Sequence, residues 1–153
     1  MYSKHIEKHA KKIADAELNK HLKFYREHIP NSYDKQNTTE AKEQYLKDSA
    51  KYYGAELTRI KKALLNGRFY AGVKSVSSSG MSRTITLAYI YKNKLHTIRD
   101  KNILALAGVS ANGRIGGCGM DMLFHAQYTL FNNLHRSYKE ANYTKRLKQY
   151  NNI

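Results

Sequence analysis

The residues best suited to chemistry lie in residues 116–125, where three glycines and the only cysteine of the chain lead into an apolar segment. Glycines at a helix start leave several N–H groups without intrahelical partners, and the missing Cβ atoms let a ligand approach them closely. The same position favours a thiolate, because the N-terminal end of a helix carries about half a positive charge. Two chemistries are therefore open here, anion binding and nucleophilic attack by Cys118.

The anion-binding hypothesis joins this stretch to a second one, residues 77–83, and requires the two to lie side by side. Backbone N–H, hydroxyl and guanidinium groups would then surround one anion. The ligand-binding residues predicted on this basis are Ser79, Ser82, Arg83, Arg114, Gly117 and Gly119. The glycine spacing matches neither a P-loop nor a dinucleotide fingerprint. A structural alternative stays open, in which the glycines only permit a close crossing and Asp121, with Arg83 or His125, pins the helix to the sheet.

The cysteine-enzyme hypothesis uses Cys118 as the nucleophile and His96 as its base, with Asp100 or Asp121 orienting the imidazole. His125 is a poorer base, because it lies seven residues along the same helix, roughly 10 Å from the cysteine. A cysteine is more often a buried, unreactive side chain than a nucleophile, so we favour anion binding over catalysis by Cys118. A single cysteine cannot form an internal disulfide, which predicts a reducing, cytoplasmic location.

We predict no metal and no cofactor. His5 and His9 have the i, i+4 spacing of a helical metal site, and His21 and His28 follow on the same helix. Neither cysteine nor a carboxylate cluster completes a ligand set there. Solvated surface histidines are the simpler interpretation. The sequence also has no run approaching eighteen apolar residues, and its N-terminus is basic and polar, so we expect neither a membrane span nor a signal peptide.

Two motifs carry a resemblance. Residues 79–83 read Ser-Gly-Met-Ser-Arg, and residues 117–122 read Gly-Cys-Gly-Met-Asp-Met. This pair resembles small proteins of phages and integrated elements that combine such a hairpin loop with such a helix start. The resemblance covers roughly residues 68–135, and Leu123 departs from it where glycine is expected. It implies a setting close to host defence or replication machinery.

The charge is strongly positive and unevenly distributed. The formal net charge is +15, with 14 basic and 9 acidic residues in 1–67 but 13 basic and 3 acidic residues in 68–153. A field of this sign attracts polyanions and speeds their encounter with the protein. Nucleic acid or a nucleotide phosphate is therefore the expected partner, with a host protein complex as a further possibility.

Hydrophobic periodicity predicts an α+β fold. We expect an N-terminal helical hairpin, a three-stranded antiparallel meander, a short helix, and a long C-terminal helix packed on the sheet. Pro30 ends the first helix, and a polar loop follows to Asn37. The predicted helices cover 3–28, 39–64, 101–107 and a segment from about 120, and the predicted strands cover 68–76, 83–91 and 95–98. The domains predicted are a helical hairpin in 1–67, an α+β core in 68–138 and a basic flexible tail in 139–153.

The buried face of the final helix follows from the same period. Its predicted members are Met120, Leu123, Phe124, Gln127, Leu130, Phe131, Leu134 and Tyr138.

The resulting functional hypothesis is a noncatalytic phage or mobile-element protein that binds nucleic acid or a nucleotide phosphate and interferes with host defence. Two alternatives are retained. One is a cysteine-dependent hydrolase or transferase, and the other is an interaction scaffold that exposes the apolar stripe of 46–64. The sequence leaves open DNA against RNA, and monomer against homo-oligomer.

Overall fold

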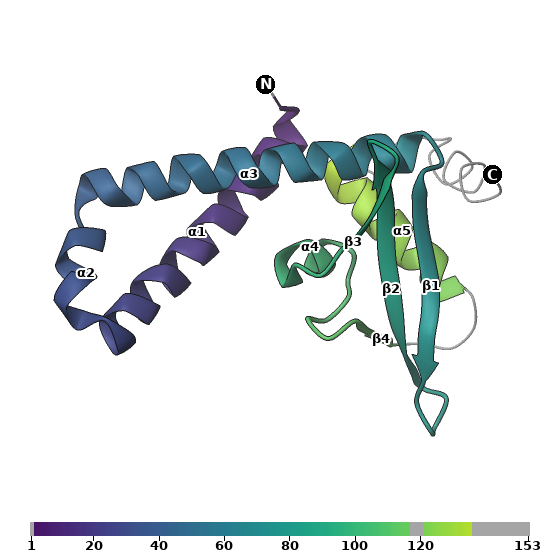
Figure 1. Ribbon diagram of the computed structural model, residues 1–153. Coiled ribbons are helices and arrows are strands. Elements are labelled where there is room, and N and C mark those ends of the chain that lie inside the picture. Colours follow the sequence, from purple (N-terminus) through teal and green to yellow (C-terminus); the bar gives the residue numbers. More distant parts are fainter. Residues whose placement is uncertain (1, 117–120, 136–153) are drawn as a thin grey trace. The chain divides into compact units, whose positions relative to one another are not determined.

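The computed structural model describes residues 2–116 and 121–135 (Figure 1). The predicted α+β class is confirmed. The chain forms two compact units, Met1–Leu57 and Thr58–Ile153, referred to below as unit 1 and unit 2. Their division falls inside one continuous helix, whereas the sequence suggests a boundary at Gly67, where that helix ends. Helix periodicity marks where a helix stops, and it carries no signal for a change of packing partners along the same helix.

Unit 1 is helical. Helix α1 (Lys4–His28) begins at Ser3, whose hydroxyl accepts a hydrogen bond from the Ile6 N–H at 3.3 Å. Its apolar residues at steps of four, Ile6, Ala10, Ala14 and Leu18, are all buried, which gives the helix one buried stripe.

The polar loop predicted after Pro30 is wrong. Helix α2 (Pro30–Gln36) occupies it, with Pro30 at the first helical turn, where a missing N–H has no cost. Helix α3 (Thr39–Leu65) follows and agrees with the prediction for 39–64. Because α2 intervenes, α1 and α3 diverge towards it rather than run side by side as a simple hairpin (Figure 1).

Two tyrosines join α1 to the first part of α3. The Tyr2 hydroxyl donates to the Lys51 carbonyl at 3.1 Å, and the Tyr2 ring lies on Gly54, where a Cβ would overlap it. The Tyr45 hydroxyl donates to the Glu17 carbonyl at 3.4 Å. Both hydrogen bonds run from a tyrosine hydroxyl to a backbone carbonyl and connect distant segments of unit 1.

Unit 2 contains an antiparallel sheet. Strands β1 (Phe69–Val76), β2 (Ser82–Tyr91) and β3 (Lys94–Thr97) form the predicted meander. A fourth strand, β4 (Arg114–Gly116), corrects the three-stranded prediction by pairing with β2. Strands β3 and β4 share one edge of β2, and β1 occupies the other.

One face of this sheet is the core. Phe69, Ile85, Leu87 and Tyr89 are buried on it, and α5 (Asp121–Leu134) packs against β1. Helix α4 (Lys101–Leu106) joins this layer, since the Asn133 side-chain amide donates to the Leu106 carbonyl at 2.7 Å.

The buried face of α5 is confirmed in large part. Buried as predicted are Leu123, Gln127, Leu130, Phe131 and Leu134, with Met122 and Ala126 in addition. Phe124 is only half-buried, and Met120 and Tyr138 lie outside the described residues.

The alternate positions of the strands form a second, outer face, which is largely exposed except at Ala88, a buried residue between Tyr70 and Thr97. Tyr70, Thr86 and Thr97 are exposed there. The loop that joins β1 to β2 extends past the ends of the paired strands (Figure 1), and Val76 and Met81 beside it are 52% and 70% exposed.

Candidate nucleic-acid interface and a cavity in unit 1

The two stretches of the anion-binding hypothesis meet at the pair of β2 with β4. Ser82 lies opposite Gly116, Arg83 opposite Ile115 and Thr84 opposite Arg114. The end of the 77–83 loop thus lies beside the strand that leads to the glycine-rich stretch. Among the residues that the structure describes, the two stretches therefore lie side by side, as the hypothesis requires.

Arg83 is the most unusual side chain at this junction. It is half-buried on the core face of the sheet, across from the buried Ile115. Its Nη1 is inaccessible to solvent, and no acceptor for it occurs in the described part of the chain. Burying a charged donor without an acceptor is costly, so such groups usually mark a bound ion or a functional site.

Among the described residues, the predicted ligands Arg114 and Ser79 do not lie beside the Arg83 side chain. Arg114 lies opposite Thr84, the neighbour of Arg83, and adjacent residues of a strand point to opposite faces. Ser79 lies near the hairpin tip, where its hydroxyl accepts from the Met81 N–H at 3.3 Å and shares a hydrogen bond with Ser77. Gly117 and Gly119 lie outside the described residues.

His96 lies near the opposite end of β2. It pairs with Tyr89 and stacks on that ring, with centroids 5.3 Å apart at 18°. Tyr89 and Ser82, the β2 partner of Gly116, are seven residues apart, about 23 Å along a strand. The register therefore does not bring His96 to the end of β4. Cys118 itself lies outside the described residues, so the cysteine-enzyme hypothesis stays a prediction without geometric support.

The predicted polar pin of Asp121 and His125 is placed only in part. Asp121 begins α5, and its side chain lies outside what the structure describes. His125 is exposed, and its ring stacks on Tyr128 at 14°, with centroids 6.4 Å apart. The pin stays a prediction.

The outer face of the sheet combines an aromatic ring with cations. Tyr70 is 46% exposed in β1, Arg68 and Lys74 are exposed on either side of it in the chain, and Arg114 is exposed on β4, opposite Thr84. In 58–116 and 121–135, unit 2 has 11 basic and 2 acidic residues. One of these acids, Asp100, is engaged as the N-cap of α4, where it accepts from the Asn102 N–H at 2.8 Å. The surface is therefore basic with little internal compensation.

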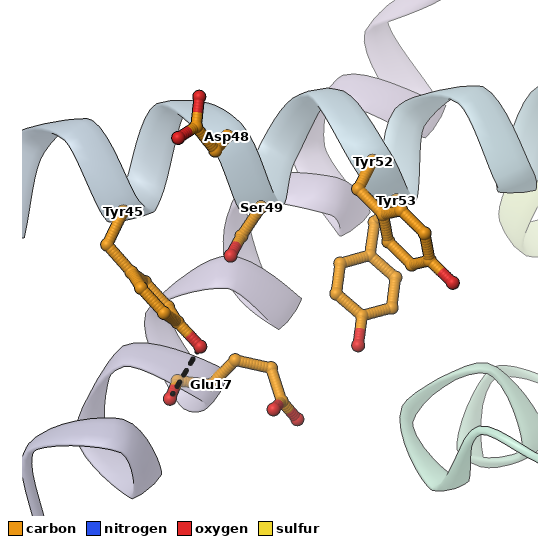
Figure 2. A pocket seen from close by; sticks show the side chains of 6 residues that line it. All are labelled: Glu17, Tyr45, Asp48, Ser49, Tyr52 and Tyr53. Carbon is orange, nitrogen blue, oxygen red and sulfur yellow. Dashed lines mark hydrogen bonds between the residues drawn. The ribbon is translucent and has the colours of Figure 1, made fainter.

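Unit 1 contains a feature that the sequence did not reveal. A cavity of about 300 Å³ lies between α1 and α3 (Figure 2). Its lining consists of acidic, hydroxyl and aromatic side chains, namely Glu17, Tyr45, Asp48, Ser49, Tyr52 and Tyr53. The helical period could have placed the five α3 residues on neighbouring faces, but only the fold brings Glu17 to them.

Comparison with known proteins identifies no relative, because no family model matches and neither a curated protein nor a solved structure is significantly similar. Among the described helices, none has the length and apolar character needed to cross a lipid bilayer. Within the same residues, no three metal-ligating side chains gather.

Proposed function

We propose that the chain is a noncatalytic nucleic-acid-binding protein whose contact surface is the outer face and hairpin of the unit 2 sheet. The observation that carries this proposal is a long acid-free stretch. Between Glu56 and Asp100 the chain has nine basic residues and no acidic one, and this stretch builds β1, β2 and β3. Phosphate groups approaching the sheet therefore meet attraction without local repulsion.

The outer face also offers a stacking platform. Tyr70 is exposed near the start of the edge strand β1, and exposed aromatic rings on sheets stack unpaired bases. Arg68 is exposed two residues before it, and Lys74 and Arg114 are exposed farther along the sheet, where they can contact the phosphate backbone. A flat ring flanked by cations favours a single strand over a closed duplex, because only unpaired bases present a free face.

A phage or mobile-element setting, with a role against host defence, is part of the same proposal. It rests on the resemblance of residues 79–83 and 117–122 to proteins of that kind. A basic protein that binds nucleic acid without cutting it could act by occupying a strand that a host complex must recognise.

A salt titration tests the binding proposal. Labelled oligonucleotides of single-stranded DNA, single-stranded RNA and duplex DNA are titrated with the full chain between about 50 and about 200 mM salt. We expect the logarithm of the association constant to fall linearly with the logarithm of salt concentration, and the single strands to bind more tightly. No binding at the lowest salt, or an affinity that ignores salt, would overturn the proposal.

The buried Nη1 of Arg83 favours a second candidate function, binding of one phosphate group at the junction of β2 and β4. The probes are inorganic phosphate and a nucleoside triphosphate. We expect Arg83→Ala to weaken binding about tenfold or more, since a charge-assisted hydrogen bond contributes about 1.5–3 kcal/mol. Arg99→Ala, which removes the same charge from an exposed position outside the proposed contact surface, is the matched control. Equal affinities in the two variants would remove this candidate.

A further inference from the structure

The cavity of unit 1 differs from the rest of the chain in its charge. In a protein of net charge +15, its lining holds two carboxylates, three phenol rings and a hydroxyl, and no lysine or arginine. Figure 2 shows Glu17 projecting from α1 into the space below the α3 tyrosines, while the Asp48 carboxylate points to the other side of α3. The Asp48 carboxylate accepts from the Gln44 amide at 2.9 Å. By its direction, Glu17 is the carboxylate that faces the tyrosine rings.

The rings of this cavity are held in position by their neighbours. Tyr45 is fixed at its hydroxyl by the Glu17 carbonyl, and His21 stacks on its ring with centroids 4.4 Å apart. His21 is joined in turn to Gln36 of α2 by a hydrogen bond of 3.0 Å. Tyr52 and Tyr53 meet edge to face at 5.2 Å and 88°. The lining is thus preorganised, which lowers the entropy cost of binding.

We propose that this cavity binds an organic cation, an alkylammonium or alkylguanidinium group. Phenol rings attract cations to their faces, and a carboxylate supplies the opposite charge. The same lining repels anions. A volume of about 300 Å³ is at the lower end of small-molecule sites, which suits a cation the size of a lysine or arginine side chain.

Such a group has two sources, a free polyamine or a basic side chain of a protein. The proposal is independent of nucleic-acid binding, since every lining residue belongs to unit 1.

Calorimetric titration of the full chain tests the site. The probes are agmatine, spermidine, and a short arginine peptide capped at both ends. We expect saturable binding that Glu17→Gln weakens about tenfold or more. Glu43→Gln is the matched control, because it removes the same charge from an exposed position of α3 outside the cavity. Tighter binding of the amines assigns the site to a free ligand, and tighter binding of the peptide assigns it to a side chain.

A second variant guards against loss of folding. Tyr52 is 60% exposed, so replacing it should leave the helices intact. We expect Tyr52→Leu to weaken binding and Tyr52→Phe, which keeps the ring, to restore it. Failure of all three probes to bind, or equal affinity in the Glu17→Gln and Glu43→Gln variants, would overturn the proposal.

Discussion

The two units differ most in how their charges are balanced. Met1–Leu57 holds 11 basic and 9 acidic residues, a net charge of +2, whereas Thr58–Ile153 holds 16 basic and 3 acidic residues, a net charge of +13. Mixed charges on helices are typical of solvated faces, as in the exposed pair of Lys11 with Glu7. Nearly all of the net positive charge of the protein therefore lies in unit 2. We expect a polyanion to bind there.

The units also differ in the shape that they present. Unit 1 has a cavity lined by aromatic and acidic side chains, whereas unit 2 has an open sheet face and a projecting hairpin. A cavity selects a ligand by its shape and charge, and an open basic face suits an extended polymer. We infer two binding surfaces of opposite preference in one chain.

The largest expected effect tests the division into units. Leu130 is completely buried in α5, so Leu130→Ala should lower the free energy of unfolding by about 2–5 kcal/mol. Leu95→Ala, at a side chain 65% exposed, should change it by less than about 0.5 kcal/mol. Hydrogen exchange should show the Leu130→Ala loss of protection mainly in 58–135. An equal loss over both units would contradict the division.

Tyr70→Ala tests whether the outer face of unit 2 binds single-stranded nucleic acid. Loss of one stacked base should weaken single-strand binding by about 1–3 kcal/mol, measured by anisotropy at constant salt. Tyr70→Phe retains the ring and should bind like the original protein. If both variants bind with unchanged affinity, the outer face is not the contact surface.

Two substitutions of Asp100 distinguish its role as a helix cap from the effect of its negative charge. Because its side chain caps α4, Asp100→Ala should cost about 1 kcal/mol in thermal or chemical unfolding. Asp100→Asn keeps a capping oxygen, so it should keep most of that stability and slightly raise the affinity for polyanions. Equal destabilisation by both substitutions would show that the negative charge, and not the cap, is what α4 needs.

The smallest expected effect is the pH dependence of stability that His9 of unit 1 causes. Burial, with Lys8, Lys12 and His5 nearby, lowers the pKa of His9 below 6.5. The unfolded chain therefore takes up this proton first, and stability should fall as the pH drops through 6.5. His9→Gln should flatten that part of the profile, followed by chemical unfolding at several pH values. An unchanged slope would exclude His9 as its source.

The sequence predicted the long elements and the short α4 and β3, but not helix α2 or the pairing of β4 with β2. The stripe from Tyr53 to Leu64 is buried as its spacing of three and four indicates, and Leu46 is half-buried. The scaffold alternative stays a prediction. Helix α2 was missed because Pro30 reads equally as a stop and as a first turn. Strand β4 has three residues, too few to show a period, and it is held by pairing with β2.

The candidate sites were less accessible from the sequence because they depend on register and on distant contacts. The types of Ser82 and Arg83 suggested an anion site, but only the pairing with β4 shows that Arg114 points to the other face. The cavity was missed because Glu17 is far in sequence from Tyr45, and α2 determines how they meet.

One measurement tests the central claim, that unit 2 carries the polyanion-binding surface. Two triple variants of equal net charge are compared in the salt titration, one in each unit. The substitutions to glutamine are at the exposed Arg68, Lys74 and Arg114, and at the exposed Lys20, Lys23 and Lys47. We expect the unit 2 variant to lose affinity about tenfold or more and its salt slope to fall by about 0.7 per lost phosphate contact, while the unit 1 variant keeps its slope. Equal losses in the two variants would show that binding follows net charge alone and would contradict the account.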